Sequence, residues 1–180
     1  MRIAFTIVML ASSAFAFAND AARVPVEATD ASVAYPAGWV QMPLTSDPPS
    51  VMFVLCDQSE EAGCLVQGEM TLGLVPVGRK IESLDHELDA AKASVELASL
   101  AHKVRIGPYD AVETNWTGQH SNHIQWAVTR GNLLIETTSG YYDCMLTTAP
   151  DRFPELSDTW RSLCASLDLE KNQTGLKSHG

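Results

Sequence analysis

Apolar and polar residues alternate in several short runs between residues 103 and 148, and this pattern sets the fold class. In two runs every second residue is apolar, aromatic or threonine: Val112, Thr114 and Trp116, then Ile124, Trp126 and Val128. Successive side chains of a strand point to opposite faces, so a period of two indicates half-buried strands. Short turn motifs separate the runs: Gly107-Pro108, Gly131-Asn132 and Ser139-Gly140. We therefore predict an antiparallel meander, with Gly131-Asn132 as a compact hairpin turn.

Two other segments follow a helical period. The first has apolar residues at spacings of four, three, four and three: Leu84, Leu88, Ala91, Val95 and Ala98. Ser83 is the predicted N-cap, because its hydroxyl can accept a hydrogen bond from a free N–H of the first turn. The second segment has a similar stripe: Phe153, Leu156, Trp160, Leu163 and Leu167. We predict an α+β fold, a mostly antiparallel twisted sheet with helices packed on it.

The N-terminus has the features of a secretory signal peptide. Arg2 precedes an apolar run, and small residues follow in the pattern that signal peptidases cleave. The run is shorter than the ~20 residues that span a bilayer, so we predict no membrane span. We expect residues 1–18 to be removed after Ala18, and the protein to be periplasmic or secreted. The remaining chain is predicted to have three parts: a flexible lead-in (19–30), one globular domain (31–168) and a polar tail (169–180).

The charge of the chain narrows the classes of partner. The formal net charge is -10. An acidic surface repels nucleic-acid phosphates and anionic lipid headgroups, so these are not expected to bind. A protein partner with a basic surface is favoured instead.

The chain has four cysteines, Cys56, Cys64, Cys144 and Cys164. Exported proteins retain disulfides, and neither the C-x2-C spacing of zinc sites nor a C-x-x-C redox motif is present. Cys56 and Cys64 flank a polar loop between strand-like runs, which favours a staple across a hairpin and leaves Cys144 to pair with Cys164. Loop closure suggests about 2.6 kcal/mol for the first bond and about 3.3 kcal/mol for the second. Free thiols or another pairing remain open as alternatives.

The search for catalytic or ligand-binding motifs is negative. The sequence has no G-x-S-x-G motif and no glycine-rich phosphate loop. His120 and His123 lie in a strand-like run, where residues three apart point to opposite faces, so a shared metal is not expected. Asp143 stands beside Tyr141 and is interpreted as a strand residue near a turn. We predict no enzymatic activity, no metal and no cofactor.

Three residues are candidates for an interface. Trp39 follows a Y-P-x-G turn, and tryptophan is enriched in binding surfaces. Glu60 and Glu61 lie in the loop between Cys56 and Cys64. An adjacent carboxylate pair can act as acid and base, but in a polar loop it is more often simply solvated. The other tryptophans lie on apolar stripes and are predicted in the core: Trp116, Trp126 and Trp160.

Several stretches resemble Mog1/PsbP-like domains, which include bacterial DcrB-like proteins. "YPAGW" at 35–39 is similar to their opening, and "DCMLTTAPDRFPELSDTWRSLCASL" at 143–167 is similar to their last strand, short loop and helix. The strands around "AVETNWTG" agree in order and spacing, so the resemblance covers most of 31–168. It implies an αβα sandwich and an interaction role, since known members bind Ran GTPase or belong to photosystem II, and it supplies no catalytic residues. The chain lacks a lipoprotein cysteine, and its four cysteines are outside the general pattern.

These observations predict an exported, non-enzymatic accessory domain of the bacterial envelope that binds a protein. A more specific version is an immunity or inhibitor protein that blocks a basic toxin. Two other classes stay open. One is a periplasmic hydrolase with an unrecognised carboxylate or histidine site, and the other is a small-molecule carrier that uses the apolar sheet face as its pocket.

Overall fold

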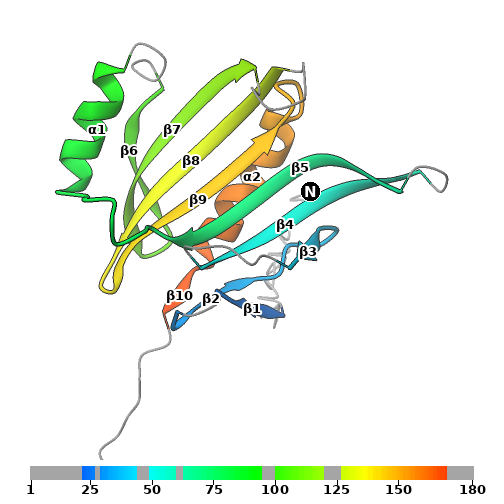
Figure 1. The fold of residues 1–180 in the computed structure, drawn as a ribbon, viewed down its shortest axis with the longest axis horizontal. Coiled ribbons are helices and arrows are strands. Elements are labelled where there is room, and N and C mark those ends of the chain that lie inside the picture. The colour runs from blue at the N-terminus through cyan, green and yellow to red at the C-terminus, as the bar shows by residue number, and fades with distance from the viewer. Residues whose placement is uncertain are drawn as a thin grey trace, which may run out of the picture.

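The computed structural model describes residues 22–26, 29–43, 49–59, 63–94, 100–119 and 127–169. Ten strands and two helices lie in these ranges (Figure 1). Their bounds are β1 Arg23–Pro25, β2 Ala31–Ala34, β3 Val40–Met42, β4 Ser50–Ser59, β5 Gly63–Leu74, α1 Leu84–Ala93, β6 His102–Ile106, β7 Tyr109–Gln119, β8 Ala127–Thr137, β9 Gly140–Thr148, α2 Phe153–Ala165 and β10 Asp168–Leu169.

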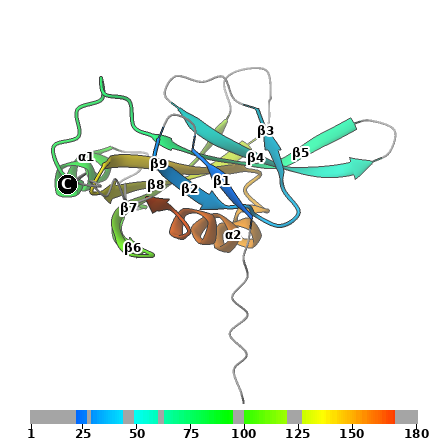
Figure 2. The ribbon, with the colours of Figure 1, turned by 90° about the horizontal axis from the view of Figure 1, so that it is seen from below.

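The strands form one large and one small sheet. The large sheet has the order β3-β4-β5-β9-β8-β7-β6, and each neighbouring pair is antiparallel. The small sheet has the order β1-β2-β10 and is also antiparallel. Figure 2 shows α2 lying along one face of the large sheet. The predicted α+β fold, a mostly antiparallel sheet with helices packed on it, is confirmed.

Alternation along the strands assigns the two helices to opposite faces. Leu133 belongs to the main core, which also contains Trp160 of α2. Leu134, the next residue of β8, belongs to a second cluster with Leu84 of α1. Because consecutive strand residues point to opposite faces, α2 and α1 sandwich the sheet between them. The main core also includes the small sheet, through Val33 of β2.

The N-terminal segment is more ordered than predicted. Residues 19–30 were expected to form a flexible lead-in, but β1 pairs with β2, and Val24 and Val26 are buried in the main core. Arg23 also donates a hydrogen bond to the Ser166 carbonyl at 2.8 Å. The domain therefore begins within the expected lead-in, because Val24 and Val26, two residues apart, both bury their side chains in the core. The predicted signal peptide, 1–18, lies outside the described residues.

The beginning of α1 is as predicted, and its end is not. The Ser83 hydroxyl accepts a hydrogen bond from the His86 N–H at 3.1 Å, so the predicted N-cap is confirmed. The helix ends at Ala93, where Ser94 adopts an extended conformation. The apolar stripe continues beyond this point, so periodicity alone overestimates the length. Val95 and Ala98 lie outside the described residues.

The prediction of a hairpin turn at Gly131-Asn132 is wrong. Strand β8 passes straight through both residues, and Gly131 pairs with Asn115 of β7 and Leu146 of β9. A Cβ atom on Gly131 would lie 2.8 Å from the Trp160 ring. The glycine thus admits the indole of α2 against the sheet, and it does not reverse the chain.

Substitution of Gly131 tests this interpretation. We expect Gly131→Ala to lower the free energy of unfolding by about 1 to 3 kcal/mol, because the added methyl overpacks the Trp160 contact. Gly78→Ala is the matched control, since a Cβ atom there meets nothing within 4 Å. Thermal unfolding of both variants measures the difference. Equal melting temperatures for the two variants would contradict the packing role.

Candidate functional site

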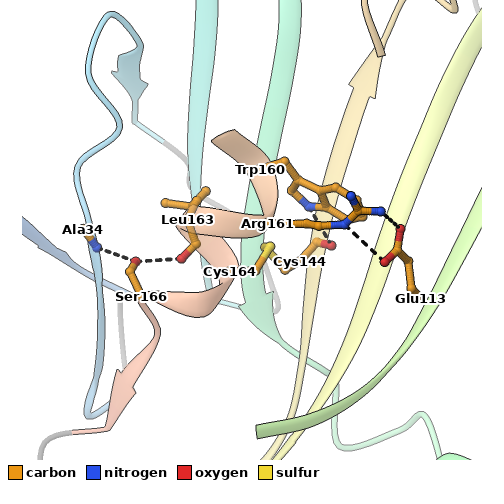
Figure 3. Close-up of a disulfide and its surroundings, with 8 residues drawn as sticks. All are labelled: Ala34, Glu113, Cys144, Trp160, Arg161, Leu163, Cys164 and Ser166. Atoms are coloured by element: carbon orange, nitrogen blue, oxygen red, sulfur yellow. Dashed lines mark hydrogen bonds and ion pairs between the residues drawn. A yellow bond between two sulfur atoms is a disulfide. The ribbon is translucent and has the colours of Figure 1, made fainter. Parts of the chain in front are cut away.

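The predicted Cys144–Cys164 disulfide is confirmed and joins β9 to α2 (Figure 3). Both cysteines are fully buried, and their Cα atoms are 6.0 Å apart. Cys56 is also disulfide-bonded. The side chain of Cys64, its predicted partner, lies outside the described residues, so that pairing stays a prediction.

An ion pair between partly exposed Arg161 and a buried carboxylate lies beside the disulfide and also fastens α2 to the sheet. Glu113 of β7 is only 1% exposed. Arg161 donates from Nε to Glu113 Oε2 at 3.3 Å and from Nη2 to Oε1, which makes a two-pronged contact (Figure 3). The hydrogen bond to Glu113 raises the pKa of Arg161. Trp160 Nε1 donates to the Cys144 carbonyl at 3.2 Å. The sequence analysis did not predict this pair, although Glu113 lies two residues from the buried Ala111 and therefore on the same face of β7.

The prediction that Trp39 lies at an interface is corrected by its burial. Trp39 is 5% exposed and belongs to the main core. Its ring packs so close to β5 that a Cβ atom on Gly68 would lie 3.2 Å away. Tyr35 donates from its hydroxyl to the Trp39 carbonyl at 2.7 Å, and Gly38 has a φ of 81°. The "YPAGW" segment is therefore a packed corner, in which the left-handed glycine turns the indole inward.

Other predicted residues lie outside the described part of the chain. These are Glu60, Glu61, His120, His123 and Trp126. Of the remaining tryptophans, Trp160 is fully buried as predicted. Trp116 is only partly buried and lines a cavity, so its assignment to the core is wrong.

Helix α1 covers only one end of its face of the large sheet. Its Leu84 packs in a cluster with Val112 and Leu134. Thr114 and Asn132 are each two residues from Val112 and Leu134 on the same strands, so their side chains lie on the same face. Figure 1 shows α1 on the β6–β7 side of the molecule, away from β3, β4 and β5. Of the two described helices, only α1 contributes residues to this second cluster.

Cross-strand pairing identifies the residues on the part of this sheet face that α1 leaves uncovered. Starting from Thr114, directly opposed residues lead across six strands: Asn132, Met145, Thr71, Met52 and Met42. We call this row, together with Trp116 and Arg130 beside it, the open sheet face. Met42 is 42% exposed, Arg130 is exposed, and the others are half-buried. Three methionines and a tryptophan within a polar surround form a deformable apolar surface.

A cavity of about 390 Å³ lies on the open sheet face beside Arg79 of the loop before α1. Seven residues line it: Arg79, Thr114, Trp116, Arg130, Asn132, Asp143 and Met145. A neighbouring hollow of about 290 Å³ shares Arg79, Thr114 and Asn132 and extends under Ala90 and Ala91 of α1. The small alanine side chains leave this space between the helix and the sheet.

Arg79 organises the charges of the cavity. Its guanidinium lies 3.0 Å from Asp143 Oδ2 and 3.0 Å from Glu87 Oε2, so it links the loop before α1 to β9 and to α1 itself. Asp143 Oδ1 and Asn132 Oδ1 are buried, and neither has a hydrogen-bond partner among the described residues. Unsatisfied buried acceptors carry a free-energy cost that a bound donor can remove. Asp143 was interpreted as a plain strand residue. Its pairing with Arg79, which is 64 residues away, has no local signal.

Burial raises the pKa of Asp143, and this effect outweighs the opposing charge of Arg79. An acid whose pKa is higher in the folded than in the unfolded state contributes stability that is fully present below its unfolded pKa, about 3.9. This contribution is lost as the pH rises through the pKa of the folded state. We expect the stability of wild type minus that of Asp143→Asn to fall as the pH increases from about 3.5 to about 7.

Urea unfolding at several pH values measures this difference. Asp151→Asn, at an exposed position, controls for the change in net charge. A difference that increases with pH would contradict the expectation and show that attraction to Arg79 dominates.

The cavity presents one carboxylate, two guanidinium groups and one amide beside Trp116 and Met145. Among the described residues that line it, none is a histidine, cysteine or serine. In the same described ranges no group of three or more His, Cys, Asp or Glu side chains is placed to hold a metal ion. A search of these ranges also finds no helix with the length and hydrophobicity to cross a membrane.

The sequence matches no family profile and no curated protein. Solved structures do match. A crystal structure from Bacteroides thetaiotaomicron VPI-5482 aligns with a TM-score of 0.55 and 16% identity, over 79% of this chain and 46% of that one. The chain thus spans less than half of that protein. The Saccharomyces cerevisiae Ran-binding protein Mog1p aligns with a TM-score of 0.52 and 10% identity, over 82% of this chain and 94% of its own.

A third match has a lower score. Cyanobacterial PsbP (CyanoP) from Synechocystis sp. PCC 6803 aligns with a TM-score of 0.47 and 13% identity, over 82% of this chain and 91% of that one. Identities this low transfer no activity. The alignment with nearly all of Mog1p, together with the helix–sheet–helix layering, shows that the chain has a Mog1/PsbP-like fold.

Proposed function

We propose that the protein is an exported accessory protein of the bacterial envelope that binds a protein partner through the open sheet face and catalyses no reaction. The observation that carries the proposal is the row of half-exposed methionines beside Trp116, on a part of the sheet that α1 leaves uncovered. Methionine and aromatic residues are enriched in protein interfaces, and an unbranched thioether adapts to the shape of a partner.

The chemistry of the chain supports export and a basic partner. The buried Cys144–Cys164 bond suits an oxidising compartment, and the N-terminal sequence predicts secretion. The formal charge of -10 favours a partner with a basic surface and steers its approach. An immunity or inhibitor protein that blocks a basic toxin is one specific form of this proposal.

One of the proteins with a similar fold has a named partner, and this supports a binding role. Mog1p is a Ran-binding protein and aligns at a TM-score of 0.52. The same architecture can therefore serve protein recognition. The partner of this chain is proposed from its own surface, since 10% identity does not transfer a partner.

Capture from an envelope extract tests the proposal. We expect wild-type protein to capture a saturable partner at low salt and less at high salt, because added salt screens charge attraction. The variant Met42→Glu/Met145→Glu should lose this partner, since it adds two charges to the open sheet face. Leu100→Glu changes a residue that is 38% exposed elsewhere and should retain it.

A photo-crosslinker at position 145 adds a direct readout. It should label the captured protein, while one at position 100 should not. Equal capture by both glutamate variants, or no saturable partner at either salt concentration, would refute the proposal.

A small-molecule carrier is the second candidate, and the 390 Å³ cavity beside Trp116 favours it. Its volume lies in the range of small-ligand pockets. Native mass spectrometry of protein purified from its own compartment should then show a bound compound. The complex should dissociate when Asn132→Leu fills the cavity floor. A mass equal to that of the bare chain would exclude this candidate.

A further inference from the structure

The cavity of about 390 Å³ on the open sheet face is lined by one arginine that is paired with carboxylates and one that is not. Arg79 lies 3.0 Å from both Asp143 and Glu87. Arg130 is exposed, and its Nε donates to the neutral hydroxyl of Thr147 at 3.4 Å. Among the described residues, no carboxylate lies within ion-pair distance of Arg130. A planar guanidinium in this state matches a ligand carboxylate, which it can hold by two parallel hydrogen bonds.

An apolar surface lies directly beside Arg130. Trp116 of β7 is paired with Arg130 across the sheet. Met145 of β9 lies opposite Asn132, and both line the same cavity. The indole of Trp116 lies over its own strand, because a Cβ atom on Gly118 would overlap the ring. This ring and the thioether of Met145 form a wall against which a flat, aromatic ligand can pack.

The other end of the cavity has hydrogen-bond acceptors without donors. Asn132 Oδ1 and Asp143 Oδ1 are buried, and no described residue donates to either oxygen. Asn132 is two residues from Arg130, so the two positions are about 6.6 Å apart along β8. A ligand held at Arg130 can therefore reach Asn132 with a group at its opposite end. A hydroxyl or an amino group there supplies the donor and removes the free-energy cost of an unsatisfied oxygen.

The acidic groups of this face are placed so that an anion can bind beside Arg130. Asp143 is held by Arg79 and lies opposite Leu134. Leu134 is four residues from Arg130, or about 13 Å along the strand. Glu69 lies in the same row as Arg130, but the strand that carries Thr147 separates them, which makes the distance about 10 Å. Charges separated by more than about 8 Å are largely screened at physiological ionic strength, so Arg130 determines the charge of the ligand at this end.

We propose that this cavity binds a small aromatic carboxylate with a hydroxyl or amino group opposite its carboxylate. Arg130 holds the carboxylate, Trp116 and Met145 contact the ring, and Asn132 accepts a hydrogen bond from the donor. One six-membered ring with substituents at opposite ends matches the spacing of Arg130 and Asn132. The volume of about 390 Å³ is in the range of small-ligand pockets. The inference rests on the second candidate function, the small-molecule carrier, and names the chemical class of its ligand.

Isothermal titration calorimetry with 4-hydroxybenzoate tests the site. We expect wild type to bind one molecule per chain, and Arg130→Gln to weaken binding by at least about tenfold, because a charge-assisted pair is lost. Arg105→Gln removes the same charge from a side chain that is 68% exposed on β6 and should leave the affinity unchanged. Circular dichroism establishes that both variants fold. No binding by wild type, or an equal loss of affinity in the two variants, would overturn the proposal.

Two related probes test the two ends of the ligand separately. Methyl 4-hydroxybenzoate lacks the negative charge and should bind wild type at least about tenfold more weakly than 4-hydroxybenzoate. Benzoate lacks the donor and should bind at least about threefold more weakly. An ester that binds as tightly as the acid would refute the role of Arg130, and benzoate of equal affinity would refute that of Asn132.

Native mass spectrometry of protein from its own compartment keeps this proposal distinct from the carrier function. A bound compound there, together with no affinity for 4-hydroxybenzoate, would overturn the ligand class and leave the carrier function intact. Binding of 4-hydroxybenzoate that depends on Arg130, without any compound carried from the cell, would support the site and count against the carrier function.

Discussion

Arg161→Met is expected to lower the free energy of unfolding by about 3 kcal/mol, because it removes the guanidinium from the buried Glu113 carboxylate and leaves only His102, whose Nε2 is 3.8 Å from Oε2, beside it. Glu113 is 1% exposed, and Arg161 contacts both of its oxygens. The Arg161 side chain is itself 40% exposed. Most of the lost free energy of unfolding therefore comes from the buried carboxylate, and little from the arginine. Urea unfolding measures the change.

A double variant separates the charge from the packing. Glu113→Met/Arg161→Met removes the buried charge together with its partner, and we expect it to recover most of the lost stability. A double variant as unstable as Arg161→Met alone would show that the loss is due to the packing of the arginine stem over Trp160, whose ring centre is 5.9 Å from the guanidinium carbon.

Loss of the Cys144–Cys164 bond is expected to have the other large effect. The loop-closure term for a separation of 20 residues is about 3.3 kcal/mol, which corresponds to a decrease of about 10 °C in melting temperature. We expect Cys144→Ala/Cys164→Ala to show this decrease and to weaken hydrogen-exchange protection in α2, because the bond ties that helix to the sheet.

The second cysteine pair supplies the control. Cys56→Ser/Cys64→Ser should leave α2 protected and cost less, about 2 to 3 kcal/mol, since Cys56 is only half-buried on β4. Equal melting temperatures for the two double variants, or full protection of α2 without Cys144, would contradict the fastening role of the buried bond.

The elements that sequence analysis predicted well are those with a strong local signal. The period of two in Val112, Thr114 and Trp116 depends only on the pleat of the strand, and the Ser83 cap depends on neighbouring N–H groups. Both are decided within a few residues. The role of Gly131 is not decided by its sequence neighbours. Its sequence context suggests a turn, whereas its role depends on Trp160, an aromatic residue that reaches it only in the folded chain.

The candidate site was less predictable for the same reason. The Arg79–Asp143 pair joins a loop to a strand 64 residues away, and periodicity contains no information about such distances. The open sheet face depends on where α1 ends. A helix that continued through Val95 would be expected to cover more of the sheet, and the stripe in the sequence suggested that it did. Trp39 was misjudged because its burial requires the Gly38 turn and the nearby Gly68.

The disulfide between β9 and α2 also affects how the protein responds to proteases. The short connection between these elements is exposed at residues 149–151, and both ends of it lie inside the covalent ring closed by Cys144 and Cys164. A cut there would open the ring without releasing α2, since the sulfur bridge still holds the two pieces together. The nicked protein should migrate as one band without reductant and as two bands with it. An extracellular protease could therefore cleave the chain at one of its accessible loops and leave both pieces in place.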